Sequence, residues 1–425
     1  MINAHCGLGG GSAQESITPP PDLHDTVALP CGASLKNRLG KSSLSEQISD
    51  RENRPTADLL RIYERWAKGG AGLLMTGNVM IDRTALEEPR NVVVDDERDM
   101  AMLKRWAAAA QSTGAHCWPQ LSHPGRQSLR TLTPVPVAPS AVPMTFGRGL
   151  YATPRALEER EILEIIQKFA RTARIMKDAG FSGVQLMGAH GYLISSFLSA
   201  LTNKREDDWG GSPDKRSHFM VETLRAVRAV VGKDFPISIK LNSADFQRGG
   251  IEEEESLAVL KTLEAEGIDL VEISGGSYEN AVMMGQDVKV RESTKAREAY
   301  FLVFAEKARQ VTKVPLMLTG GFRSLAGMKA AIAGGAIDVV GLGRPLCVDP
   351  DLAQKLLDGT AQPMVLPPRR VGVPEFDAIL EVFWYTQQLH RIAAGIEPDP
   401  NRGNWWALLV ALWNNGFDTF RRKRS

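Results

Sequence analysis

A helix-to-strand unit in residues 158–188, EEREILEIIQKFARTARIMKDAGFSGVQLMG, decides the fold. Apolar residues recur at helical spacing before Gly180 and predict a helix with one apolar stripe, formed by Ile162, Ile165, Ile166, Phe169 and Ala173. Gly180 ends the helix, and the short apolar run that follows has the length of a buried strand. The stretch therefore predicts one helix that leads directly into one strand.

The same unit recurs from about residue 35 onward. Residues 56–68 predict another amphipathic helix that ends at Gly69-Gly70, and Glu266-Gly267 leads into a further strand. The candidate strands are residues 38–42, 72–76, 117–121, 183–187, 236–241, 270–274, 315–319 and 339–341. Strands that alternate with helices indicate a parallel sheet with crossover helices. Eight such units predict an α/β fold closed into a (β/α)8 barrel.

The barrel is expected to cover residues 28–365, between two segments of different character. Residues 1–27 are rich in Gly, Ser and Pro and predict a flexible N-terminal arm. Residues 366–425 do not continue the alternation and predict a C-terminal helical extension. Within the barrel, the proline-rich stretch 131–153 is long enough to be a wall or lid of the substrate pocket, with surface decoration as the alternative.

The composition is that of a globular, water-soluble protein. Hydrophobic residues make up 43% and charged residues 24% of the chain, and no run of 18 apolar residues indicates a membrane span. A formal net charge of +1 argues against a nucleic-acid partner, which requires a clustered excess of Lys and Arg. We expect small-molecule partners and a cytoplasmic location, since no signal-peptide pattern opens the chain; homo-oligomerisation stays open.

The cysteines and the C-terminal tail give weaker indications. The four cysteines lack metal-ligand spacing, so we expect reduced thiols and no metal site. The tail combines tryptophans with a basic end, namely Trp384, Trp405, Trp406, Trp413, Arg421, Arg422, Lys423 and Arg424. Two interpretations stay open: peripheral association with a membrane surface, or packing on the chain's own domain or in a dimer contact.

Residues 184–199, VQLMGAHGYLISSFLS, carry the functional signal, and NKREDDWGGS follows at residues 203–212. Further motifs are LKNR at 35–38, QLSHPGR at 120–126, GGF at 320–322 and GLGRP at 341–345. Together these motifs resemble the Old Yellow Enzyme family of FMN-dependent ene reductases, in the family's order over residues 28–365. In its length and tail the chain is similar to fungal-type members. The resemblance implies a barrel that binds FMN and passes hydride from NADPH or NADH to an activated alkene.

The resemblance also implies catalytic roles for two residues that follow the fourth strand. His190 would donate a hydrogen bond to the substrate carbonyl, on which negative charge develops as the alkene accepts hydride. Tyr192 would protonate the α-carbon, a role that suits a phenol with an ordinary pKa of about 10. The chain is therefore expected to be an NAD(P)H-dependent FMN oxidoreductase of the ene-reductase or NADPH dehydrogenase type.

Met187 departs from the family pattern. Relatives carry a histidine at the first position of the carbonyl-binding pair, and a thioether cannot donate a hydrogen bond. The loss of one such donor costs ~3 kcal/mol of transition-state stabilisation. The alternative hypothesis is therefore a flavin-binding protein, or another FMN oxidoreductase in which Met187 has changed the usual chemistry.

The resemblance implies an FMN site assembled from several strand ends. Its residues are Ser42, Ser43, Leu44, Ser45, Gly77, Gln120, Lys240, Gly320, Gly321, Gly343 and Arg344. The Gln120 amide suits the pyrimidine edge of a flavin, and a cation at Lys240 would stabilise the reduced ring. The glycines and Arg344 follow the last two strands, where barrels of this kind bind phosphate.

Overall fold

A computed structural model describes residues 19–145, 149–276, 279, 299, 301–364, 366–367, 369–372, 374–407, 409–410 and 413. Most of the predicted N-terminal arm, part of the 131–153 stretch and the basic end from Arg421 to Arg424 lie outside the described residues. The strands are β1 Val27–Ala28, β2 Ser34–Leu35, β3 Leu39–Lys41, β4 Leu73–Met80, β5 Val92–Val93, β6 His116–Ser122, β7 Val137–Ala138, β8 Arg155–Ala156, β9 Val184–Gly188, β10 Ile237–Asn242, β11 Leu270–Ser274, β12 Leu316–Thr319 and β13 Val339–Leu342.

The helices alternate with the barrel strands. They are α1 Ala57–Lys68, α2 Met100–Ala110, the short 3-10 helix η1 Gly125–Gln127, α3 Glu159–Asp178, α4 Leu193–Leu198, α5 Pro213–Val231, α6 Glu253–Ala265, α8 Leu302–Arg309, α9 Leu325–Ala333, α10 Pro345–Val348, α11 Leu352–Leu357 and α12 Pro374–Ala393. No helix in the described part of the chain is long and apolar enough to cross a membrane.

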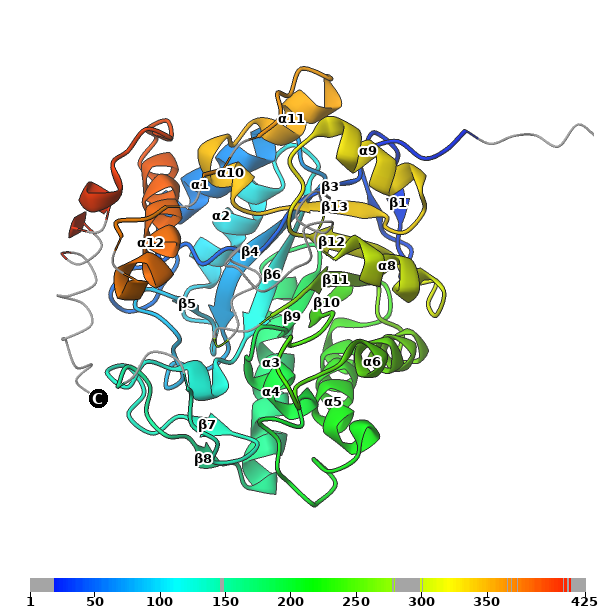
Figure 1. The fold of residues 1–425 in the computed structure, drawn as a ribbon, viewed down its shortest axis with the longest axis vertical. Coiled ribbons are helices and arrows are strands. Elements are labelled where there is room, and N and C mark those ends of the chain that lie inside the picture. Colours follow the sequence, from blue (N-terminus) through cyan, green and yellow to red (C-terminus); the bar gives the residue numbers. More distant parts are fainter. Residues whose placement is uncertain are drawn as a thin grey trace, which may run out of the picture.

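Eight parallel strands within the described residues close into a barrel. Their order is β3-β13-β12-β11-β10-β9-β6-β4, and the pairing of β3 with β4 completes the ring. The helices surround this ring (Figure 1). The structure thus confirms the predicted (β/α)8 barrel.

Local chemistry explains where the predicted helices begin and end. The Thr56 side chain accepts a hydrogen bond from the Leu59 amide and caps α1, and Gly69 follows its last residue. Glu158 and Glu161 form a reciprocal capping box at the start of α3. Gly180 has a φ of +91°, which turns the chain from α3 toward β9.

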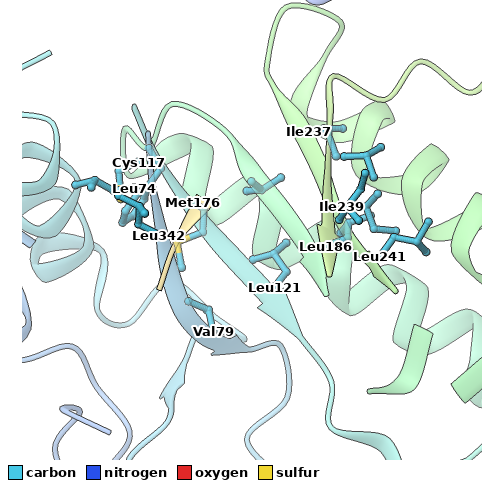
Figure 2. Packing of buried hydrophobic residues seen from close by; sticks show 14 of the residues in the cluster. Leu74, Val79, Cys117, Leu121, Met176, Leu186, Ile237, Ile239, Leu241 and Leu342 are labelled. Atoms are coloured by element: carbon cyan, nitrogen blue, oxygen red, sulfur yellow. The ribbon is translucent and has the colours of Figure 1, made fainter. Parts of the chain in front are cut away.

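The barrel strands bury apolar side chains on both faces. Leu186, Ile239 and Leu241 lie on the outer face of neighbouring strands, as Figure 2 shows, and pack against the helices. Inside, apolar side chains fill the amino-terminal end, where the β1–β2 hairpin contributes Val27, Leu29 and Leu35. Because this end is packed with apolar side chains, the polar site is restricted to the carboxyl-terminal end of the strands.

The C-terminal residues divide into a packed part and an exposed part. Helix α12 packs beside α1 and α10 (Figure 1), and its Trp384 is fully buried. Trp405, Trp406 and Trp413 are exposed. The tail therefore combines packing on its own domain, one of the two sequence interpretations, with aromatic side chains that are exposed.

Candidate active site

A cavity of about 360 Å³ opens at the carboxyl-terminal ends of the barrel strands. All but one of the predicted site residues line it: Ser42, Ser43, Leu44, Ser45, Gln120, Met187, His190, Tyr192, Lys240, Gly320, Gly321, Gly343 and Arg344. They come from β3, β6, β9, β10, β12 and β13 or from the loops that follow these strands. Closure of the barrel thus brings together residues spread over 300 positions of the sequence.

Gly77 is the exception, and its predicted position after the second barrel strand is wrong. It lies within β4 rather than after it, and the cavity lining drawn from the described residues does not include it. A Cβ atom at Gly77 would fall 1.9 Å from Glu46 Oε2 and 2.4 Å from the Leu44 carbonyl oxygen. The close approach that requires glycine is therefore to Glu46 and Leu44, so Gly77 packs behind the segment that contributes Leu44 to the cavity.

A β-bulge in β4 explains both the position of Gly77 and a residue that the sequence did not indicate. The register of β4 against β6 shifts between Met75 and Asn78. Beyond the bulge, the Asn78 side chain lines the cavity. A glycine inside an apolar strand pattern is the available signal for such a bulge.

A layer of hydrogen-bonded side chains lies in the barrel interior beneath the cavity. Ser43 Oγ donates to Gln120 Oε1 (2.8 Å), and Gln120 Nε2 donates to Gln185 Oε1 (2.7 Å). Gln185 Nε2 in turn donates to Glu272 Oε2 (2.9 Å). An amide offers two N–H groups and two oxygen lone pairs, so Gln120 retains one of each for a ligand.

Glu272 is the acidic centre of this layer. Its carboxylate lies 3.1 Å from Lys240 Nζ and accepts a hydrogen bond from Thr319 Oγ1 at 2.7 Å. Burial by itself raises the pKa of Glu272, but the Lys240 charge and the hydrogen bonds from Thr319 and Gln185 together hold that pKa below its ordinary value. Lys240 therefore faces the cavity with an ionised partner beside it.

Sequence reasoning identified Lys240 but missed its partners Gln185, Glu272 and Thr319. A signal was present, because Gln185 and Glu272 interrupt the apolar strands VQLMG and LVEIS at inward-facing positions. Both side chains are fully buried.

The glycine-rich end of the cavity has the geometry of an anion cradle. Gly320 and Gly321 have φ values of +125° and +88°, in the region that favours glycine. A Cβ atom at Gly341 would lie 2.0 Å from Thr319 Oγ1, so this position has no room for a side chain. These backbones can approach a bound phosphate closely, and the Arg344 guanidinium lines the same cavity.

Helix α12 forms a wall of the cavity that the sequence did not indicate. It contributes Glu381, Val382, Tyr385, Thr386 and Leu389 to the lining. Glu381 forms an ion pair with Arg344, which couples the helix to the anion cradle.

The described residues of the 131–153 stretch do not form the predicted wall or lid. None of them lines the cavity, and Leu132 instead packs against Met80, Leu86 and Val93.

The loop after β9 presents His190 to the cavity in a left-handed backbone conformation (φ +58°), and Gly191 follows at +83°. His190 Nε2 lies 2.8 Å from Ser274 Oγ. Burial, and secondarily the charge of Lys240, lowers the pKa of His190 well below its ordinary value. The imidazole is therefore neutral at physiological pH and can donate one N–H hydrogen bond.

Tyr192 lies at the end of the same loop and is bound by two side chains. Asn78 Nδ2 donates to its phenol oxygen at 2.8 Å, and the phenol donates to the carboxylate of Glu87. Met187 packs with Ala189 and Tyr192 and faces the cavity beside Lys240, its register partner on β10. The position for which the resemblance implies a donor is thus occupied by a thioether in the cavity wall.

The donor set fits the flavin that the resemblance implies. Gln120 offers one N–H and one lone pair, Lys240 supplies a cation, and the Gly320-Gly321 cradle lies in the same cavity as Arg344. Among the residues that the structure describes, no group of His, Cys, Asp or Glu side chains could hold a metal ion. The Gln120 amide, the Lys240 cation and the glycine-rich cradle favour an organic cofactor with a phosphate end.

Comparisons with known proteins agree with this geometry. The model of the NADH:flavin oxidoreductase / NADH oxidase family matches residues 31–362. The chain is 37% identical over 359 residues to the NADH-dependent flavin oxidoreductase iliE of Hypocrea jecorina, covering 79% of this chain and 89% of the relative. It is 38% identical over 355 residues to the iliE protein of Neonectria sp., covering 77% of this chain but 46% of that relative.

Solved structures show the same barrel. A 2-naphthoyl-CoA reductase complex superposes with a TM-score of 0.73 at 28% identity, covering 80% of this chain and 52% of that one. Morphinone reductase in complex with tetrahydroNAD gives a TM-score of 0.67 at 26% identity, with coverage of 82% and 93%. The chain therefore belongs to the NADH:flavin oxidoreductase / NADH oxidase family, in the Old Yellow Enzyme group, with FMN as its cofactor and a reduced nicotinamide nucleotide as hydride donor.

Proposed function

We propose that the chain is an ene reductase that reduces carbonyl-conjugated alkenes with hydride from NADH or NADPH. FMN, when bound, accepts that hydride and delivers it to the β-carbon of the alkene. The observation that carries the proposal is that His190 and Tyr192, from one short loop, line the same cavity as Gln120 and Lys240. A flavin and its substrate could therefore share one cavity with the two proposed catalytic side chains.

Each catalytic residue has a defined task in this proposal. The neutral His190 imidazole hydrogen-bonds the substrate carbonyl oxygen and stabilises the negative charge that develops there. Tyr192 gives its phenol proton to the α-carbon, and the Asn78 N–H group stabilises the phenolate that remains.

The cofactor residues follow from the same cavity. Gln120 would bind the pyrimidine edge of the flavin, Lys240 the region that becomes negative on reduction, and Arg344 the phosphate. The Ser45 hydroxyl, which donates to Glu88 Oε2 at 2.6 Å, would tune the ring from beside it. The named relatives that use NADH support NADH as the donor.

One observation favours a second candidate function. Met187 occupies the cavity wall where a second carbonyl donor is expected, so His190 would act alone. If one donor does not suffice, the chain would be a flavin-binding protein or an FMN oxidoreductase with a different acceptor.

We also propose the molecular context. The N-terminal arm would end near residue 27, the FMN-binding barrel would cover residues 28–365, and the helical extension would follow. The β1–β2 hairpin packs into the barrel end, which supports a boundary in this region, but the fully buried Leu23 favours an arm that ends a few residues earlier. A cytoplasmic location and small-molecule substrates remain part of the proposal, and homo-oligomerisation stays open.

Anaerobic spectroscopy of the FMN-loaded protein tests the function. NADH should bleach the flavin absorbance, and an α,β-unsaturated ketone such as 2-cyclohexenone should restore it, with the saturated ketone as product. Bleaching that a panel of enones, enals and unsaturated thioesters fails to reverse would contradict the ene-reductase assignment and favour the second candidate.

A further inference from the structure

Tyr192 belongs to a buried group of three polar side chains from three different segments. Asn78 follows the bulge in β4, Glu87 lies in the segment after β4, and Tyr192 ends the loop after β9. Asn78 Nδ2 donates to the Tyr192 oxygen at 2.8 Å and also to Glu87, while the Tyr192 hydroxyl donates to Glu87. The exposed fractions are 8% for Asn78, 4% for Glu87 and 3% for Tyr192.

Only part of this group faces the cavity. Asn78 and Tyr192 are among its lining residues, whereas Glu87 is not part of the lining drawn from the described residues. Glu87 therefore lies behind Tyr192, on the side away from the substrate. The hydrogen bond between the Tyr192 hydroxyl and Glu87 offers a direct contact for moving a proton between Glu87 and the cavity.

This arrangement meets two requirements of a phenol that acts as a proton donor in a largely buried group. The phenolate left after proton transfer needs a hydrogen-bond donor, and the Asn78 amide supplies one. The phenol must also regain a proton before the next turnover. A carboxyl group can take a proton from solvent and then carry one O–H donor, so the same oxygen-to-oxygen contact can return it.

We propose that Glu87 resupplies the proton of Tyr192 and acts as a positioning residue for the reaction, an inference that rests on the proposed function. In the first step the Tyr192 O–H bond breaks as a C–H bond forms at the substrate α-carbon, and the electron pair stays on the phenolate. In the second step Glu87, protonated from solvent, gives its proton to the phenolate, and its O–H electron pair stays on the carboxylate. Each turnover consumes one solvent proton, and neither step moves an electron to or from the flavin.

The Glu87→Gln variant separates resupply from the first proton transfer. Tyr192 begins each experiment with its own proton, so pre-reduced enzyme should complete its first enone turnover within about threefold of the wild-type rate. Later turnovers should slow by about tenfold or more, because the amide cannot pass a proton on. Flavin reduction by NADH should change by less than about twofold.

Three further variants give the matched comparison. Glu87→Asp keeps a carboxyl group and should recover most of the later turnovers. Asn78→Ala should show the reverse pattern, with the first turnover slowed about tenfold, because the phenolate loses a charge-assisted hydrogen bond. Glu97→Gln makes the same chemical change at an exposed carboxylate paired with Arg174 and should leave both phases unchanged.

The outcomes distinguish this inference from the proposed function. If no enone reoxidises the reduced wild-type protein, the result contradicts both the proposed function and the resupply role of Glu87. Wild-type turnover together with an unimpaired Glu87→Gln variant, or with a first turnover slowed as much as the later ones, contradicts the resupply role alone. If Glu87→Gln does not retain flavin, the Glu87→Asp variant decides: later turnovers as slow as those of Tyr192→Phe would overturn the role of the carboxyl group.

Discussion

Lys240 Nζ lies 3.1 Å from Glu272 Oε1 inside the barrel, and both side chains are buried at the base of the candidate cofactor cavity. In the proposed FMN complex this cation would lie beside the negative charge of the reduced flavin, while the carboxylate balances it in the flavin-free protein. The two residues occupy paired positions on β10 and β11, so the barrel itself fixes their separation.

Removing one partner of this pair should destabilise the protein. Glu272→Gln leaves the buried Lys240 charge uncompensated and should lower the free energy of unfolding of the flavin-free protein by ~3–5 kcal/mol. The double variant Lys240→Met/Glu272→Leu leaves neither charge and should recover most of that loss. Urea denaturation followed by circular dichroism measures both, and a fully stable single variant would show that the two charges are not coupled.

Met187→His tests whether the missing carbonyl donor limits turnover. A histidine in the cavity wall would add a second N–H donor, so enone turnover should rise by about tenfold or more. Met187→Leu, which adds no donor, should stay near the wild-type rate. A fall in the histidine variant would mean that the pocket is built for a different acceptor.

Tyr192→Phe removes the proposed proton donor without emptying its site. Enone reduction should fall by about two orders of magnitude or more, whereas flavin reduction by NADH should stay nearly intact, since no phenol proton is used in that half-reaction. Stopped-flow absorbance resolves the two half-reactions. Equal losses in both would refute the proton-donor role.

Arg344 and Glu381 should affect FMN binding in opposite directions. Arg344→Met removes a guanidinium from the phosphate cradle and should weaken FMN binding by about tenfold or more. Glu381→Gln frees Arg344 from its ion pair and should tighten binding. Riboflavin, which lacks the phosphate, is the matched control in fluorescence titrations, and its affinity should respond little to either change. An equal effect on riboflavin would exclude a phosphate contact.

The buried His123 should make stability fall as the pH falls below about 6.5. Burial lowers the pKa of His123 to about 4; the Asp82 charge partly opposes this shift, and the Lys168 charge adds to it. Between these two values the unfolded chain binds a proton that the folded chain does not, so acid favours unfolding. His123→Asn, whose amide oxygen can still accept the Gly125 hydrogen bond, should lose ~2 kcal/mol less stability between pH 7 and pH 5. Urea unfolding curves at the two pH values measure this difference, and identical losses in variant and wild type would contradict it.

The barrel could be predicted from the sequence because its strands and helices differ in length and period. The helix over 158–179 and the strand that follows were expected nearly to the residue, since Glu158 caps the helix and Gly180 ends it. Strand β4 was expected to stop at Thr76 but runs to Met80, because a bulge carries the strand past Gly77. A bulge depends on the neighbouring strand, which no local pattern specifies.

The residues of the candidate site also divide into those that the sequence predicted and those that it did not. The motif residues His190, Tyr192, Gln120 and Arg344 were located by pattern, and the closed barrel places them around one cavity. Glu87 and Glu381 were not expected, because one lies in an aperiodic segment and the other on a helix far along the chain. Their roles depend on tertiary contacts, with Tyr192 and with Arg344, that sequence spacing does not encode.

Flavin content is the most direct test of the central claim that this cavity seats FMN. The purified chain, incubated with excess FMN and then desalted, should retain about one flavin per chain and show a yellow spectrum shifted from that of free FMN. The Arg344→Met variant should retain less. A colourless wild-type protein that binds neither FMN nor riboflavin would contradict the account, since the hydride chemistry would have no carrier.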